Sequence, residues 1–279
     1  FHLFEGPMDR LPRVALEVWD HRPEDWTGWA MSPFADVLHD PQAWARKCVQ
    51  AYGAEVIALQ LVSADPNGMN RDVETVAAVA KGVAEAVDVP VIMWGTSNDE
   101  RDGALLRRKA EVCEGRQVAL GPVTEKNYRQ VGAVAIAYGH TVIASSPIDV
   151  NLAKQLNILL GNLGVPEDRI VMDPTTGALG YGLEYSYSVV ERDRMAALTQ
   201  EDVKLQYPVV CNIAQEVWKT RETRLTVQED PRLGDEERRS IMMESVTASS
   251  MLLAGADIVI LRHPESARLV RELIRDLSR

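Results

Sequence analysis

Eight short apolar runs alternate with amphipathic runs along the chain, and this alternation constrains the fold more than any other feature. The apolar runs are rich in valine and isoleucine and are bounded by glycine, proline or aspartate. Parallel strands that are covered on both faces have this composition. The candidate strands are Val14–Trp19, Val56–Val62, Val89–Trp94, Gln117–Gly121, Thr141–Ser145, Ile170–Asp173, Pro208–Asn212 and Asp257–Arg262.

Each candidate strand is followed by a segment with helical character. The first of these segments, Pro41–Tyr52, has Asp40 in the N-cap position and Gly53 just beyond its end. Thr124 is a candidate N-cap for the segment Glu125–Tyr138. The predicted helices are Pro41–Tyr52, Arg71–Val87, Glu100–Glu114, Glu125–Tyr138, Asp149–Leu163, Leu183–Leu198, Asp235–Ala254 and Pro264–Leu277.

Eight strand–helix units in 279 residues match the size of a (β/α)8 TIM barrel, an α/β fold, and this is the fold we expect. The alternative is a doubly wound open sheet, which usually has fewer strands and a glycine-rich phosphate turn after the first. No such turn follows Trp19. We therefore expect residues 1–279 to form a single TIM-barrel domain, with residues 1–12 as an N-terminal lead-in segment.

Composition narrows the classes of partner. The net charge is −11, which argues against nucleic acid or an anionic membrane, because binding to phosphates relies on clusters of Lys and Arg. No apolar run approaches the roughly 20 residues that cross a bilayer. The N-terminus has neither an initiator Met nor a signal peptide, so we expect a processed or trimmed chain. Three separated cysteines and no CxxC motif predict a reducing cytoplasm and no metal or iron–sulfur site in this chain.

The segment Asp173–Ser188 has the most distinctive composition in the chain. It connects the sixth candidate strand to a helix, and it contains three glycines and three tyrosines. Glycine allows a close approach of backbone to a ligand or another chain, and tyrosine offers a stiff apolar face with a polar tip. The segment is interpreted either as a functional surface that contacts a ligand or another chain, or as a turn with a helix cap.

Polar residues at the carboxyl ends of barrel strands converge on one mouth, where barrels place their function. Arg262 is suited either to an anionic ligand or to a structural salt bridge. Sequence motifs of serine hydrolases, zinc proteases and P-loop proteins are absent, and aromatic residues gather in loops instead. This favours a surface that packs on a partner or a planar ligand. The strand-end residues are Asp20, His21, Gln60, Ser63, Asp65, Thr96, Asn98, Ser145, Ser146, Asp173, Asn212, Arg262 and His263.

Several long blocks resemble one family. They are DPTTGALGYGLEYSYSVVE within Pro166–Glu191, SSPIDVNLAKQLNILL (Ser145–Leu160), LAGADIVILRHPE (Leu253–Glu265) and WARKCVQAYGAEVIALQL (Trp44–Leu61), supported by Phe1–Gly6. On these blocks the chain resembles the small (delta) subunit of the corrinoid iron–sulfur protein of the acetyl-CoA synthase/CO dehydrogenase system. Relatives carry an N-terminal extension before the segment that matches Phe1. The amino-acid sequence of the loop around Pro23–Pro33 also differs from that of relatives.

The resemblance implies a TIM barrel without catalytic residues of its own, paired in a heterodimer with a large subunit. That subunit carries a [4Fe-4S] cluster and most of the contacts to a cobalamin (corrinoid) at the interface. The assembly carries a methyl group from methyltetrahydrofolate methyltransferase to acetyl-CoA synthase. The alternative is an enzyme: a pterin-binding methyltetrahydrofolate methyltransferase barrel, in which Asp173 and Asn212 would hydrogen-bond the pterin ring.

The predicted corrinoid-binding residues combine small residues, hydroxyl groups and a tyrosine face around the mouth. They are Thr175, Thr176, Gly177, Gly180, Tyr181, Gly182, Ser145, Asn212 and Arg262.

Overall fold

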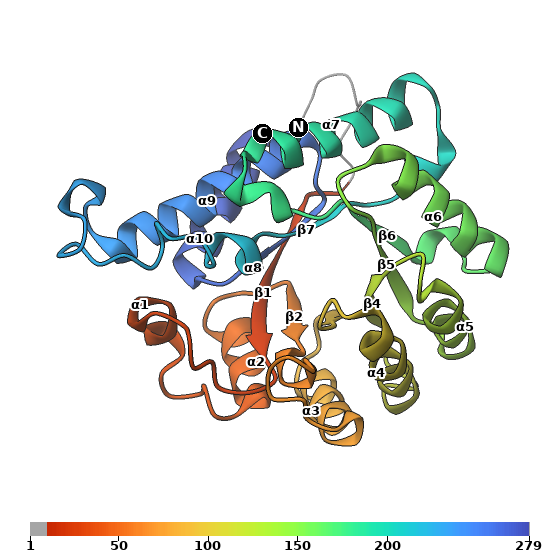
Figure 1. Ribbon diagram of the computed structural model, residues 1–279, viewed down its shortest axis with the longest axis horizontal. Helices are drawn as coiled ribbons and strands as arrows, with labels where there is room; N and C mark the ends of the chain where they lie inside the picture. The colour runs from red at the N-terminus through yellow and green to blue at the C-terminus, as the bar shows by residue number, and fades with distance from the viewer. Residues whose placement is uncertain (1–9, 279) are drawn as a thin grey trace.

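The computed structural model describes residues 10–278, in which eight parallel strands curve into a barrel surrounded by helices (Figure 1). Each strand from β1 to β5 pairs with the next one along the chain, and β8 pairs with both β1 and β7. The predicted TIM barrel is confirmed. The strands are β1 (Arg13–Trp19), β2 (Val56–Gln60), β3 (Val91–Trp94), β4 (Val118–Val123), β5 (Thr141–Ser145), β6 (Ile170–Asp173), β7 (Val210–Asn212) and β8 (Ile258–Leu261).

The least extensive strand pairing in the barrel is that between β6 and β7. A single parallel bridge, Met172 to Val209, joins them, and the Met172 amide donates to the Pro208 carbonyl at 2.7 Å. The short length of β7 leaves little backbone for a longer ladder. The barrel is therefore nearly, rather than fully, closed at this point.

The eight predicted helices are all present and cover the outside of the barrel (Figure 1). Asp40 caps the first as expected, since its carboxylate accepts the Gln42 and Ala43 amides at 3.0 Å. Gly139 and Gly164 end two others with φ of 72° and 101°, which suits glycine. The helices are α2 (Pro41–Gln50), α3 (Val73–Ala86), α4 (Asp99–Val112), α5 (Tyr128–Tyr138), α6 (Val150–Leu163), α7 (Leu183–Thr199), α9 (Glu236–Ala254) and α10 (Pro264–Leu277).

The start of α5 differs from the sequence prediction by more than that of any other of these helices. Helix α5 begins at Tyr128 with Asn127 in the N-cap position, not after Thr124. The Asn127 side-chain oxygen accepts the Thr124 amide at 2.8 Å, while the Thr124 hydroxyl donates to Asp99 at 2.6 Å. Thr124 is therefore engaged in a turn that joins two neighbouring units, and the helix starts one turn later.

Short helical elements occupy the segments between the main units. The two longest segments, which read as loops in the sequence, contain α1 and α8, so part of each is ordered as helix. These elements are α1 (Gly28–Met31), η2 (Ser32–Phe34), η3 (Val62–Ala64), η4 (Glu167–Arg169), η5 (Gly177–Gly180), η6 (Val203–Leu205), α8 (Ile213–Val217) and η7 (Pro231–Leu233).

Strand register determines which side chains enter the bore of the barrel. Small and branched residues such as Ala15, Ala58 and Ile92 fill its lower part. Because side chains alternate along a strand, the residues two positions further on also point inward. Pairing aligns Trp19 with Gln60, and Ser145 with Asp173, so these strand-end residues form a polar and aromatic upper layer. This layer is the floor of the mouth.

Within residues 10–278, no helix combines the length and the apolar character that crossing a membrane requires.

Candidate functional site

A cavity of about 630 Å³ opens at the mouth, above β5, β6 and β7. Four of the predicted binding residues line it: Ser145, Thr175, Thr176 and Asn212. They come from the ends of two strands, β5 and β7, and from the turn that follows β6. The structure thus brings together residues that are as much as 67 positions apart in the chain.

Asp173 lies at the centre of this group and is buried. Its carboxylate accepts the Ser145 hydroxyl at 2.8 Å and the Thr175 amide at 3.0 Å. Burial raises the pKa of Asp173 to about 6, although both hydrogen bonds favour the charged form, and the nearby charge of Glu216 raises it further. Asp173 can therefore exchange a proton near neutral pH.

The turn after β6 is held to the strands on either side. The Thr175 hydroxyl donates to the Ser146 carbonyl at 2.7 Å, and the Thr176 hydroxyl donates to the Asn212 carbonyl at 2.9 Å. Thr175 has a φ of 62°, which is uncommon for a residue with a branched side chain. Such strain persists where surrounding contacts enforce it, often at functional sites.

The glycine–tyrosine part of the predicted set lies elsewhere. Gly177 and Gly180 bound the short helix η5, and Gly182 precedes α7 with a φ of 147°. Tyr181 is 89% exposed, and neither it nor Gly177 or Gly182 is among the residues that line the mouth cavity. The nine predicted residues therefore divide between the cavity, an outer rim and, for Arg262, a second cavity.

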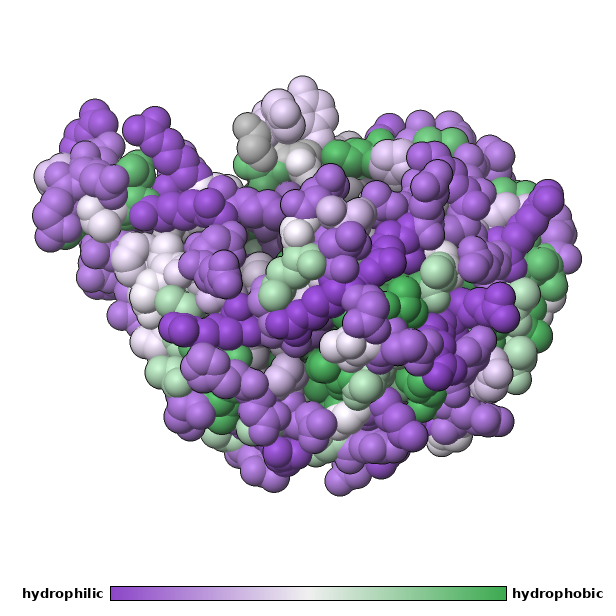
Figure 2. All heavy atoms as spheres, turned by 60° about the horizontal axis from the view of Figure 1, so that its bottom comes forward, coloured by the Kyte–Doolittle hydropathy of each residue, from purple (hydrophilic) through white to green (hydrophobic). Residues whose placement is uncertain are grey.

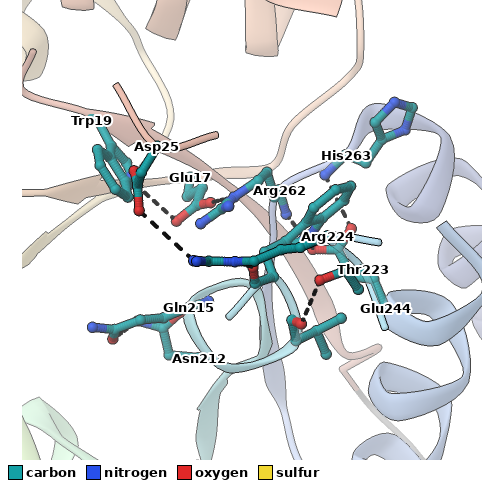
Figure 3. Close-up of polar contacts among 12 residues, drawn as sticks. Glu17, Trp19, Asp25, Asn212, Gln215, Thr223, Arg224, Glu244, Arg262 and His263 are labelled. Carbon is teal, nitrogen blue, oxygen red and sulfur yellow. Dashed lines mark hydrogen bonds and ion pairs between the residues drawn. The ribbon is translucent and has the colours of Figure 1, made fainter. Parts of the chain in front are cut away.

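Arg262 extends from the end of β8 into the bore beside a smaller cavity of about 150 Å³. Its Nε donates to the buried carboxylate of Glu17 (Figure 3). The guanidinium lies 3.8 Å from the Trp26 ring centroid. Of the two roles considered from the sequence, the structure contains the salt bridge, and Arg262 also reaches the cavity wall. Gln215 and Lys219 line both cavities, so the two adjoin.

Two carboxylates that support this arrangement were missed in the sequence. Glu17 lies within the apolar strand β1, and Glu244 is a buried residue of α9. Glu244 accepts the Arg262 amide at 2.6 Å and the Trp218 indole N–H at 2.9 Å, and burial raises its pKa. A single acidic residue inside an otherwise uncharged run was the available signal in both cases.

The tryptophans after β1 differ from the prediction. Trp19, Trp26 and Trp29 belong to the aromatic residues from which we expect a surface for a partner or a planar ligand, but Trp26 is only 6% exposed. Its ring packs edge-on against Trp19 and beneath the Arg262 guanidinium. Trp29 is half-buried and donates to the Ser240 hydroxyl at 3.2 Å. The loop folds back over the mouth because its aromatic rings bury apolar area there.

The mouth also contains more acidic groups than the sequence suggested. Asp65, Asp99 and Glu216 line the same cavity as Asp173. Glu216 belongs to α8, a helix that was not predicted. Four carboxylates thus share the wall of this cavity; two of them, Asp65 and Asp173, are among the predicted strand-end residues, and Asp99 and Glu216 are additional.

The cysteines are separate from the mouth cavity. Cys48, Cys113 and Cys211 are all free and buried, and burial raises the pKa of each thiol, that of Cys113 to about 11. In the described part of the chain, no group of three His, Cys, Asp or Glu side chains is placed to hold a metal ion.

Comparison with known proteins identifies the family. A model of the CO dehydrogenase/acetyl-CoA synthase delta subunit family matches residues 1–275. The chain belongs to this family. The blocks around Asp173 and Arg262 that carried the resemblance thus lie within the matched region.

Curated relatives that align with almost the full chain are named as subunits of the same kind. The acetyl-CoA decarbonylase/synthase complex subunit delta of Archaeoglobus fulgidus is 35% identical over 283 residues, which cover 100% of this chain and 62% of the relative. The subunit of the same name from Methanopyrus kandleri is 36% identical over 276 residues, covering 99% of this chain and 68% of the relative. The chain thus spans less than two thirds of the length of the Archaeoglobus protein.

Solved structures with the same fold include dihydropteroate synthases. The enzyme from Stenotrophomonas maltophilia, with imidazole in its active site, has a TM-score of 0.64 and 14% identity, covering 96% of this chain and 93% of its own. The Thermus thermophilus enzyme in complex with 4-aminobenzoate has a TM-score of 0.63 and 16% identity, covering 96% and 95%. At these identities the likeness establishes the fold alone.

Proposed function

We propose that this chain is the non-catalytic small subunit of a heterodimeric corrinoid iron–sulfur protein. In this role it helps carry a methyl group from methyltetrahydrofolate methyltransferase to acetyl-CoA synthase in the reductive acetyl-CoA (Wood–Ljungdahl) pathway of the cytoplasm. The observation that carries the proposal is the family match over residues 1–275. The mouth cavity supports it, because it offers a polar surface that is open to another subunit.

The cofactors are assigned mainly to the partner. The three cysteines of this chain are buried and separate, so they do not suit a [4Fe-4S] cluster, which needs four thiolates together. We therefore assign the cluster, together with most of the corrinoid contacts, to the large subunit.

The mouth suits the edge of a corrinoid rather than the whole group. A cavity of about 630 Å³ is too small to enclose a corrin ring with its side chains. Ser145, Thr176 and Asn212 present hydroxyl and amide groups that can hydrogen-bond the carboxamides at such an edge. When bound, the corrinoid supplies the cobalt that accepts and releases the methyl group. The residues of this chain orient its edge and exclude water.

Co-purification with the large subunit tests this proposal. The two chains, co-expressed and isolated through a tag on this one, should elute as a stable 1:1 complex with the absorbance of a corrinoid. An unrelated TIM barrel with the same tag serves as the control. A native chain that remains a monomer and ignores the large subunit contradicts the proposal.

A pterin-binding methyltransferase barrel is the second candidate. Asp173 favours it, since this carboxyl group has a pKa near 6 and shares the cavity with Asn212, a pair that can hydrogen-bond a pterin ring. Calorimetry with methyltetrahydrofolate decides between the two. Micromolar binding by this chain alone that is lost in Asp173→Asn, but kept in the exposed substitution Asp88→Asn, supports the enzyme. Absence of binding removes it.

A further inference from the structure

The proposed function does not use the smaller cavity beside Arg262. This cavity has a volume of about 150 Å³, and a cavity of that volume can hold a molecule the size of benzene. Its wall is formed by the segment after β1, by the residue that follows β8, and by α8 with the chain beyond it. The cavity therefore suits a small molecule rather than a segment of protein.

Three indole rings give the cavity flat apolar walls. Trp19, Trp26 and Trp218 all line it, and the rings of Trp19 and Trp26 pack edge-on with their centroids 5.1 Å apart. By contrast, the outer side that Figure 2 brings forward, which carries α2, α3 and α4 in Figure 1, is mostly hydrophilic with small separate apolar spots. The apolar part of a small ligand can pack on these rings.

The cavity wall also contains hydrogen-bond donors that have no acceptor. The Trp26 indole N–H and the Thr27 hydroxyl are buried, and neither has a partner among the described residues. Thr27 precedes α1, but its side chain makes no capping hydrogen bond. The Arg262 side chain donates through Nε to Glu17, and within residues 10–278 its two terminal nitrogens have no hydrogen-bond acceptor. Buried donors without acceptors are costly, and a ligand that supplies acceptors would satisfy them.

Two of the three cations in the cavity wall are balanced by carboxylates outside it. Arg262 pairs with Glu17, which is buried in the bore, and Lys219 pairs at 3.2 Å with Glu216, which lines the mouth cavity instead. The charges of these two ion pairs largely cancel. The attraction of the cavity for an anion therefore depends mainly on the third cation, Arg224.

Arg224 is only loosely paired. Asp25, the one acidic residue among the described residues that line this cavity, lies 3.8 Å from it (Figure 3). The two side chains are 48% and 63% exposed, and exposed ion pairs of this kind contribute little free energy. A ligand carboxylate can therefore take the place of Asp25 beside Arg224, and Asp25 competes with it.

We infer that this cavity binds a small carboxylate with a compact apolar body. Its oxygens accept hydrogen bonds from Arg224 and from the unpartnered donors, while the body packs on the indole rings. A carboxylate has only acceptors, which match this wall. A carboxamide of the same shape would bring two N–H donors, for which Asp25 is the one carboxylate acceptor in the described wall. The inference goes beyond the proposed function and does not depend on it.

The experiment titrates the full chain with isobutyrate and with isobutyramide, a neutral probe of the same shape. The Trp26 indole N–H signal in NMR spectra, assigned by its loss in Trp26→Phe, reports binding at this cavity. Thr27→Val removes one donor, and Thr27→Ser keeps it. Asp25→Asn removes the competing carboxylate. Its matched control is Asp36→Asn, because Asp36 is 66% exposed and pairs with Lys47. Thermal melting shows which variants fold.

We expect isobutyrate to shift the Trp26 signal and to bind at least about tenfold more tightly than isobutyramide. Thr27→Val should weaken isobutyrate binding by about fivefold, the loss of one hydrogen bond, and Thr27→Ser should not. Asp25→Asn should strengthen binding, whereas Asp36→Asn should leave Kd unchanged. Equal affinity for the two probes, or the same Kd in Asp25→Asn as in wild type, overturns the carboxylate. Binding of neither probe overturns the site, while the proposed function, which is tested with the large subunit, is unaffected.

Discussion

Two aspartates in the second half of the barrel are buried, but their surroundings differ. Asp173 accepts two hydrogen bonds at the mouth, and its pKa is about 6. Asp193, on α7, has no hydrogen-bond partner for either carboxylate oxygen within the described residues, and burial raises its pKa to about 7. The sequence predicted a role only for Asp173, because Asp193 lies among charged neighbours that look like a solvated helix face.

Asp193 should make stability depend on pH. Its carboxyl group holds a proton more tightly when folded, at a pKa of about 7, than when unfolded near 3.8. Between these values the folded state binds more protons, so the free energy of unfolding falls as pH rises, by at most about 1.4 kcal/mol per pH unit. Because Asp173, with a pKa of about 6, adds a slope of the same sign, urea unfolding at several pH values should give a less negative slope in Asp193→Asn than in wild type and in Asp88→Asn. An unchanged slope in Asp193→Asn contradicts the assignment.

At the scale of elements, the sequence predicted the strands and the main helices, but it did not predict the start of α5 or the presence of α8. The start of α5 was predicted too early because Thr124 is a good N-cap in isolation; its hydroxyl accepts the Lys126 amide at 3.3 Å and donates to Asp99 of the neighbouring unit, but these contacts hold a turn, and Asn127 precedes the helix. Helix α8 was missed because its five residues lie in a long polar link. Both errors arise where contacts between units override local preference.

Gly255 tests how one helix end supports its neighbour. It ends α9 with a φ of 119°, and an added Cβ would lie 3.2 Å from the Arg194 Nε. Gly255→Ala should destabilise the fold by more than the roughly 1–2 kcal/mol of left-handed strain, because Arg194 must also move. Gly115→Ala is the control, with a φ of 81° and no atom within 4 Å of the new Cβ. Equal losses of unfolding free energy for the two variants would show that the Arg194 contact contributes nothing.

At the scale of the whole molecule, the barrel joins the two ends of the chain through the ion pair of Glu17 and Arg262. The pair links β1 to β8 inside the bore, where both side chains are nearly inaccessible to water. Trp19, Trp26 and Trp218 surround the guanidinium. A charge at either position alone would lie in an apolar interior without a partner.

Replacing one partner of this ion pair should lower the free energy of unfolding strongly, whereas replacing both partners should lower it much less. Arg262→Met leaves Glu17 buried and uncompensated, so the free energy of unfolding should fall by about 3–5 kcal/mol. The double variant Glu17→Met with Arg262→Met should recover most of that loss. Arg268→Met, which removes exposed ion pairs on α10, is the comparison and should change stability much less. The assignment is wrong if Arg262→Met is as stable as Arg268→Met.

By itself, the sequence determined the barrel, its eight strand–helix units and the family, because these depend on periodic patterns and long blocks of residues that each segment carries locally. Only the tertiary structure decided the surroundings of each polar group. It divided the nine predicted binding residues between a cavity, a rim and a buried ion pair, and it brought Glu216 beside Asp173. It also placed α7 beside the end of α9, where Arg194 donates to the Gly255 carbonyl. These outcomes depend on which segments closure of the barrel makes neighbours, and no local pattern encodes that.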